Sequence, residues 1–187
     1  MQLRTHQDGT TATPAARSRP DCPWPVVLGI DPGTRVVGFG AVVARERGPR
    51  LFGAGVIRPG ARLDVPARLA LILREFEELL AEVRPDVVVV EQAFISRNLQ
   101  SALRIGEGRG VILAAAARFG CQVVQFPPAV AKKALVGNGA ADKTQVAAMV
   151  AETLGLEEAP EPLDASDALA LALAHVLRSK SALARKR

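Results

Sequence analysis

Aromatic residues and cysteines are scarce in this chain of 187 residues. Tyrosine is absent, and aromatic residues make up 4% of the chain although hydrophobic residues make up 49%. Alanine, valine and leucine must therefore fill the core, which favours close packing and many helices. No apolar run reaches the roughly 18 residues that a membrane span needs. Two cysteines form no disulfide framework, and no Cys/His cluster indicates zinc, so we expect a protein of the reducing cytoplasm.

The length suits one domain, and the charge is placed mostly at its end. The net charge is +5, to which the C-terminal Lys180, Arg185, Lys186 and Arg187 contribute most. We expect a disordered extension over 1–22, a single domain over 23–179 and a basic tail over 180–187. A basic tail on a neutral body does not by itself establish nucleic-acid binding.

Hydrophobic periodicity predicts an α/β fold. Three strands joined by short links predict an antiparallel meander, and a helix followed by another strand adds a parallel pairing. We therefore expect a five-stranded mixed β-sheet flanked by helices. The expected strands are 26–31, 36–43, 50–57, 86–91 and 121–126, and the expected helices are 65–83, 96–119, 127–136, 142–154 and 164–177.

Glycines interrupt several of these elements, including the third strand at Gly53 and Gly55. Gly38 and Gly40 within the second strand indicate a close approach of another backbone. Gly106, Gly108 and Gly110 lie in the middle of a predicted helix, where each costs about 1 kcal/mol relative to alanine. Either a close neighbouring backbone or room for a ligand explains this triplet.

Acidic residues stand where two buried strands end and where the last helix begins. Asp31 follows the run 26–30, and Glu91 follows the run 87–90. Asp31 opens the segment Asp-Pro-Gly-Thr, which suits a tight turn as well as a site. Each of the other acids also has a simpler interpretation. Glu91 can be a solvated residue at a strand end, and Asp164 and Asp167, which share one face at the helix start, can be helix-capping residues.

Taken together, the four acids indicate a binding site for divalent metal ions. If the first and fourth strands are neighbours, Asp31 and Glu91 project at the same edge of the sheet. Clustered carboxylates repel one another unless a cation lies between them. Mg²⁺ takes a few carboxylates together with water and phosphate, and two such ions about 3.5–4 Å apart promote phosphodiester cleavage.

Six segments, in this order, carry a family resemblance. They are Gly-Ile-Asp31-Pro-Gly-Thr-Arg, Glu91-Gln-Ala-Phe-Ile-Ser-Arg-Asn, Ser101-Ala-Leu-Arg, Val136-Gly-Asn-Gly, Asp142-Lys-Thr-Gln-Val and Leu-Asp164-Ala-Ser-Asp167-Ala-Leu-Ala. Over roughly 26–178 the chain resembles the RuvC family of bacterial Holliday-junction resolvases. The resemblance implies an RNase H-like fold, a homodimer, two Mg²⁺ or Mn²⁺ ions, paired symmetric nicks in four-way DNA junctions, and partnership with the RuvA–RuvB branch-migration complex.

The same resemblance assigns roles to single residues. It makes Asp31, Glu91, Asp164 and Asp167 the catalytic, metal-binding tetrad. It makes Phe94 an aromatic that stacks on an unpaired base at the crossover, where the alternative is a core phenylalanine. The remaining DNA-binding candidates are Arg97, Asn98, Lys132 and Lys143, and a solvated helix face is the alternative for the lysines. His175 is predicted to be structural.

Three other functions compete with this interpretation. An actin-like ATPase also uses a strand followed by Asp-x-Gly-Thr, but it needs a duplicated domain and the chain has no repeat. A non-catalytic junction-binding protein on the same fold would not need four acids. The third alternative is a related nuclease that processes RNA. Comparing an RNA–DNA hybrid with a four-way junction as substrate would distinguish it from a junction resolvase.

Overall fold

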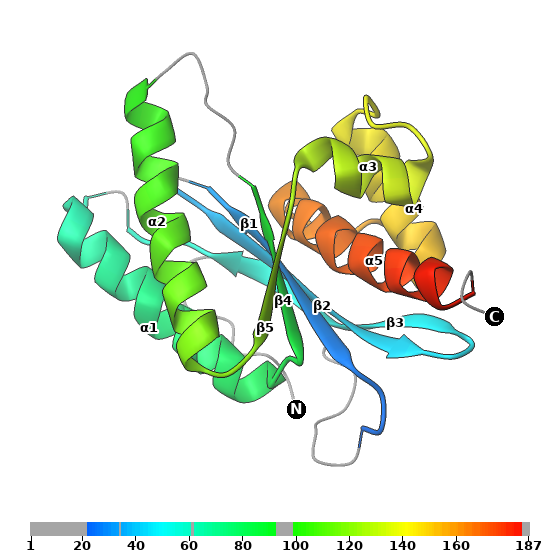
Figure 1. Cartoon of the computed structure of the whole chain (residues 1–187). Helices are drawn as coiled ribbons and strands as arrows, with labels where there is room; N and C mark the ends of the chain where they lie inside the picture. The colour runs from blue at the N-terminus through cyan, green and yellow to red at the C-terminus, as the bar shows by residue number, and fades with distance from the viewer. Residues whose placement is uncertain (1–21, 34, 61, 93–98, 185–187) are drawn as a thin grey trace.

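A five-stranded mixed sheet forms the centre of the molecule (Figure 1). The computed structural model describes residues 22–33, 35–60, 62–92 and 99–184. Strands β1 (Val26–Pro32), β2 (Val37–Arg45) and β3 (Gly48–Ile57) form an antiparallel meander. Strands β4 (Val87–Glu91) and β5 (Gln122–Phe126) are parallel to β1. The order β3-β2-β1-β4-β5 confirms the expected sheet and the pairing of β1 with β4.

Five helices in the described ranges cover the two faces of this sheet (Figure 1). Helices α1 (Val65–Val83) and α2 (Leu99–Arg118) lie on one face. Helices α3 (Pro128–Val136), α4 (Lys143–Leu154) and α5 (Leu163–Ala184) lie on the other. None of them is long and apolar enough to cross a membrane.

The expected boundaries agree with these elements to within a few residues, apart from two helix ends. Helix α5 continues to Ala184, whereas the sequence predicted an end at 177. No glycine or proline stands between 178 and 184 to stop it. The expected beginning of the helix over 96–119 falls partly on 93–98, which lie outside the described residues.

Side chains of each central strand alternate between two cores. Val26, Leu28 and Ile30 pack against α1 and α2, whereas Val27 packs on the side of α5. In β4, Val88 and Val90 belong to the first core and Val87 and Val89 to the second. Because successive side chains of a strand point to opposite faces, Asp31 and Glu91 both fall on the α5 face.

Helix α5 lies unusually close to β1 and β2. A Cβ atom on Gly29 would stand 1.9 Å from the carbonyl oxygen of Ala168, and one on Gly38 would stand 2.1 Å from that of Asp164. A Cβ on Gly40 would meet the side chain of Leu169 at 2.5 Å. The close approach that Gly38 and Gly40 predicted is therefore confirmed, and Gly29 contributes to the same contact.

The glycines of α2 have a different environment. Nothing in the described residues lies within 4 Å of a Cβ built on Gly106 or Gly110. A Cβ on Gly108 would meet only the Cδ1 atom of Ile72, at an ordinary 3.8 Å. A close backbone neighbour within the described chain is therefore not the reason for this triplet.

We predict that Gly29→Ala lowers the free energy of unfolding by about 1–3 kcal/mol or more, because the added methyl group forces α5 away from β1. The matched control is Gly108→Ala, which adds the same atom where there is room. It should be neutral or should stabilise by up to about 1 kcal/mol. Urea unfolding followed by circular dichroism measures both, and equal stability of the two variants would contradict the contact.

Candidate active site

Asp31 and Glu91 meet at the edge where β1 and β4 end. The register pairs Ile30 with Val90, so the next residues of the two strands stand side by side. Both lie on the α5 face, and their carboxyl groups are near enough to shift one another's pKa.

The electrostatics of this pair follow mainly from burial. Burial is the largest cause that raises the pKa of Asp31 to about 7, and the negative charges of Glu91 and Asp167 act in the same direction. Burial also raises the pKa of Glu91, and Asp167 adds to that rise, while the hydrogen bond from Asp31 opposes it. In the metal-free protein near neutral pH, the pair therefore retains a proton that two exposed carboxylates would release.

The first turns of α5 bring Asp164 and Asp167 to the same place. The backbone of Asp164 lies over Gly38, and Gly38 is the partner of Asp31 in the β1–β2 register. Asp167 is near enough to shift the pKa values of both Asp31 and Glu91. Asp31, Glu91 and Asp167 therefore lie at one edge of the sheet, and Asp164 lies three residues before Asp167 in the first turn of α5.

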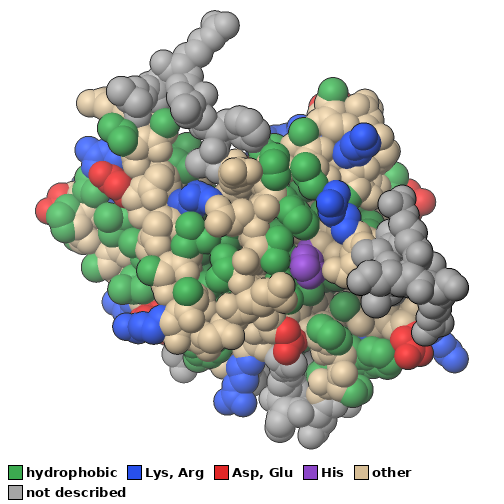
Figure 2. Space-filling view, in the orientation of Figure 1, with side chains coloured by type: hydrophobic (Ala, Val, Ile, Leu, Met, Phe, Trp, Pro, Cys, Tyr) green, Lys and Arg blue, Asp and Glu red, His purple; other side chains and the backbone are tan. Residues whose placement is uncertain are grey.

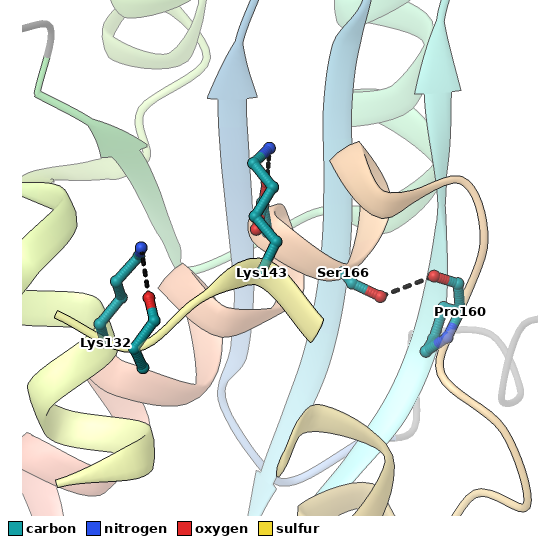
Figure 3. Close-up of polar contacts among 6 residues, drawn as sticks. Lys132, Lys143, Pro160 and Ser166 are labelled. Atoms are coloured by element: carbon teal, nitrogen blue, oxygen red, sulfur yellow. Dashed lines mark hydrogen bonds and ion pairs between the residues drawn. The ribbon is translucent and has the colours of Figure 1, made fainter. Parts of the chain in front are cut away.

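Asp164 is not the N-cap residue of α5. The helix begins at Leu163, which places Asp164 inside the first turn rather than at the N-cap. The turn is held instead by Ser166, whose buried hydroxyl donates to the carbonyl oxygen of Pro160 at 2.6 Å (Figure 3). Asp164 and Asp167 are both only partly buried.

Lys143 supplies a positive charge to this group of acids. Its Nζ donates to Oδ2 of Asp167 at 2.6 Å (Figure 3). The hydrogen bond with Asp167 raises the pKa of Lys143, and the charges of Asp31 and Asp164 act in the same direction. Its place is set by local structure, because Asp142 and Gln145 form a capping box that starts α4 at Lys143.

Lys132 approaches the site from α3. Its Nζ donates to the carbonyl oxygen of Ala141 at 2.6 Å, which ties α3 to the start of α4 (Figure 3). Its charge also lowers the pKa of Glu91, as a smaller effect than burial. On the described part of the face in Figure 2, basic side chains are dispersed among hydrophobic and neutral ones.

Phe94, Arg97 and Asn98 lie outside the described residues, so their predicted DNA contacts stay predictions. His175 packs against Phe126 with ring centroids 6.2 Å apart. Burial lowers the pKa of His175, and Arg178 stands over the same phenylalanine ring at 5.6 Å. This apolar stacking agrees with the structural role expected for His175.

Sequence reasoning missed Arg109, which touches the backbone of a candidate site residue. Its Nε donates to the carbonyl oxygen of Glu91 at 3.1 Å, and its Nη2 donates to Oε1 of Gln125. The sequence spacing could have identified it. Arg109 lies three residues before Ile112 and seven before Ala116, and both of these residues are buried. That spacing puts a cation on the sheet-facing side of an amphipathic helix.

The donor atoms at this edge of the sheet suit a hard divalent cation. Carboxylate oxygens are the ligands that Mg²⁺ and Mn²⁺ prefer, and no thiolate or imidazole competes among the four predicted residues. In this conformation, no three acidic, histidine or cysteine side chains of the described ranges are grouped closely enough to hold an ion. Instead, Lys143 donates to Asp167, and the raised pKa of Asp31 favours the uncharged form of that carboxyl group.

Residues 27–175 match the family model described as Crossover junction endodeoxyribonuclease RuvC. A protein of that name from Chlorobaculum parvum is 42% identical over 156 residues, which are 83% of this chain and 83% of the relative. The solved structure of Thermus thermophilus RuvC superimposes with a TM-score of 0.77 at 36% identity, covering 84% of this chain and 96% of the other. T. thermophilus RuvC in complex with a Holliday junction substrate gives a TM-score of 0.76 at 34% identity, covering 83% and 96%.

We predict that Asp31→Asn stabilises the metal-free protein at pH 8 but much less at pH 4. An acid whose pKa is raised in the folded state binds its proton more tightly there than in the unfolded chain. Stability is therefore lost as the pH rises from the unfolded value of 3.8 to about 7, and an uncharged isostere avoids the loss. The difference should reach a few kcal/mol, at about 1.4 kcal/mol per pKa unit.

Melting temperatures in EDTA between pH 4 and pH 8 measure this effect. Glu152→Gln, at an exposed carboxyl group of α4, is the matched control and should follow the wild type at every pH. Parallel curves for Asp31→Asn and the wild type would show that the carboxyl group is not desolvated in the way described.

Proposed function

Because this chain belongs to the RuvC family of crossover junction endodeoxyribonucleases, we propose that it resolves four-way (Holliday) DNA junctions by symmetric paired nicks that depend on divalent metal. The observation that carries the proposal is the convergence of Asp31, Glu91 and Asp167 at one sheet edge beside Lys143. The substrate follows the T. thermophilus relative, which was solved in complex with a Holliday junction. All four predicted acids lie inside the range that matches the family model.

We assign metal binding to the four carboxylates of Asp31, Glu91, Asp164 and Asp167. They fit two Mg²⁺ or Mn²⁺ ions by donor chemistry, by their common location and by the shortage of positive charge among them. When bound, such ions activate water and stabilise the charge that develops on a phosphodiester during hydrolysis. Because only an ionised carboxyl group is a good ligand, metal binding requires that Asp31 and Glu91 be deprotonated.

The lysines act on the DNA in this proposal. Lys143 neutralises Asp167 in the free protein and, once the acids hold metal, is released to a phosphate beside the cleaved bond. Lys132 stands next to it through its contact with Ala141 and contacts a neighbouring phosphate. Such contacts fix the strand in register and supply salt-sensitive affinity, but they read no base sequence.

Phe94, Arg97 and Asn98 complete the proposed DNA surface. They follow Glu91 in the chain by three to seven residues, and Glu91 is the last residue of β4. An aromatic side chain there suits stacking on an unpaired base of the crossover, because every base presents a π-face. Arg97 and Asn98 suit backbone contacts next to it.

A four-way junction presents two equivalent strands, so we also propose a homodimer with two-fold symmetry. The exposed side of α2 is the candidate interface. Leu103 is 59% exposed there, and small exposed residues follow it at helical spacing, namely Gly106, Gly110, Ala114 and Ala117. Small residues let two helices approach closely, and an interface would explain glycines that no described neighbour requires. Partnership with a RuvA–RuvB complex and a cytoplasmic location are proposed from family membership alone.

We predict that Asp31→Asn abolishes junction nicking but leaves junction binding within about twofold of the wild type. The carboxamide keeps the shape of the side chain and loses the charge that holds metal, while phosphate contacts elsewhere carry affinity. Nicking of a mobile four-way junction with Mg²⁺, and gel-shift affinity in EDTA, measure the two properties. An RNA–DNA hybrid in parallel tests the alternative substrate, and retained cleavage by Asp31→Asn would remove Asp31 from the tetrad.

We predict that the protein is a dimer at micromolar concentration and that Gly110→Arg makes it a monomer. The long cation prevents close approach at α2 but improves helix propensity, so the variant should remain folded by circular dichroism. Ala148→Arg, at an exposed position of α4, is the matched control and should remain a dimer. Light scattering gives the mass, and a wild-type monomer that is still monomeric on the junction would refute the dimer.

A further inference from the structure

Arg109 joins α2 to the end of the strand that carries Glu91. Its two polar contacts go to different strands, because Glu91 ends β4 and Gln125 lies in β5. Both acceptors are neutral oxygens, one of the backbone and one of a side-chain amide. The guanidinium group therefore acts here as a fork of donors rather than as the partner of an acid.

The position that Arg109 holds is the last residue of β4. The ladder with β1 ends at Val90, so on that side Glu91 is already past the paired register. On the other side, the amide of Gln92 donates to the carbonyl oxygen of Phe126 at 2.8 Å. The hydrogen bond from Arg109 therefore holds the carbonyl group of Glu91 at the point where β4 ends.

Arg109 contacts the backbone of Glu91 rather than its carboxyl group. The pKa of that carboxyl group is raised mainly by burial, and Asp31 and the charges of Asp167, Lys143 and Lys132 also shift it. Arg109 reaches the backbone oxygen instead and is oriented there by Gln125. A displacement of about 1 Å at a reacting group can lower a rate by about a hundredfold, so a contact that fixes Glu91 matters without touching the substrate.

We propose that Arg109 is a positioning residue that holds Glu91 in the geometry needed to bind divalent metal, with Gln125 as its support. The proposal rests on the proposed function, in which Glu91 is a metal ligand. Outer residues that orient metal ligands typically change metal affinity by about 10–100-fold when they are removed. Arg109 would thus affect metal binding and cleavage while leaving affinity for the junction unchanged.

Three variants and one control test this assignment in the full-length protein. Arg109→Met removes the donors and keeps an apolar stem, Arg109→Lys keeps the charge without the fork, and Gln125→Ala removes the support. Arg118→Met is the matched control, because Arg118 lies on the same helix but pairs with Glu77 of α1. Melting temperatures first establish that each variant is folded.

Three measurements then separate an effect on position from one on general stability. Mn²⁺ binding is followed by electron paramagnetic resonance without DNA, and nicking of a four-way junction is followed as a function of Mn²⁺ concentration. Junction affinity is measured in EDTA. We expect Arg109→Met to raise the half-saturating Mn²⁺ concentration about 10–100-fold in both titrations, with affinity for the junction unchanged. Arg109→Lys and Gln125→Ala should give smaller shifts in the same direction, and Arg118→Met none.

Several results would overturn the assignment. Unchanged Mn²⁺ titrations in Arg109→Met would do so, as would an equal shift in Arg118→Met. A loss of junction affinity with unchanged Mn²⁺ binding would make Arg109 a DNA contact instead. If Arg109→Met does not fold, unchanged Mn²⁺ titrations in both Arg109→Lys and Gln125→Ala decide against the proposal. A wild type that binds Mn²⁺ but does not nick junctions would refute the proposed function, while the binding titration still tests Arg109.

Discussion

The close contact between α5 and the first two strands is the constraint on which the candidate site depends. Asp164 and Asp167 belong to a helix, whereas Asp31 and Glu91 belong to strands, and a normal helix–sheet separation would leave them farther apart. Gly29 and Gly38 remove the side chains that would hold α5 away from the sheet. The alanine-rich surface of α5, buried from Ala168 to Ala174, serves the same close packing. The shortage of aromatic residues is thus connected to the geometry of the site.

Close packing has an electrostatic consequence. The same contact that brings the acids together removes water from them, and burial is the largest cause of the raised pKa values of Asp31 and Glu91. Lys143 compensates for part of the charge through Asp167, and the raised pKa of Asp31 favours the uncharged form of that carboxyl group. In the metal-free protein near neutral pH, the buried carboxyl groups of Asp31 and Glu91 therefore lower the free energy of unfolding. Local violations of this kind are expected at functional sites, because a site ready for a divalent cation must be short of positive charge.

The fold was predictable because its signals are local, whereas contacts between distant residues were not. Period-two and helical patterns placed the strands and helices, and short links predicted the meander. The common edge of Asp31 and Glu91 followed from one assumption, the pairing of β1 with β4, which the structure confirms. The capping role considered for Asp164 was wrong because the helix begins at Leu163. Arg109 looked like one more charge in a helix weakened by glycine, because no local pattern reveals which carbonyl a long side chain will reach.

The two proposals about α2 concern different sides of one helix. Arg109 faces the sheet and reaches Glu91, whereas Gly106 and Gly110 are exposed with no described atom near a Cβ on them. Successive helical residues are turned by about 100° from one another, so Arg109 and Gly110 can serve these two sides at nearly the same height. A helix of 20 residues moves largely as one body. If a second copy of the chain packs on Gly106 and Gly110, it therefore sets the distance from α2 to the sheet, and with it the position of the guanidinium group that holds Glu91. Dimer formation and the geometry of the metal ligands would then be linked through one side chain, which gives a physical reason for placing an arginine between two glycines.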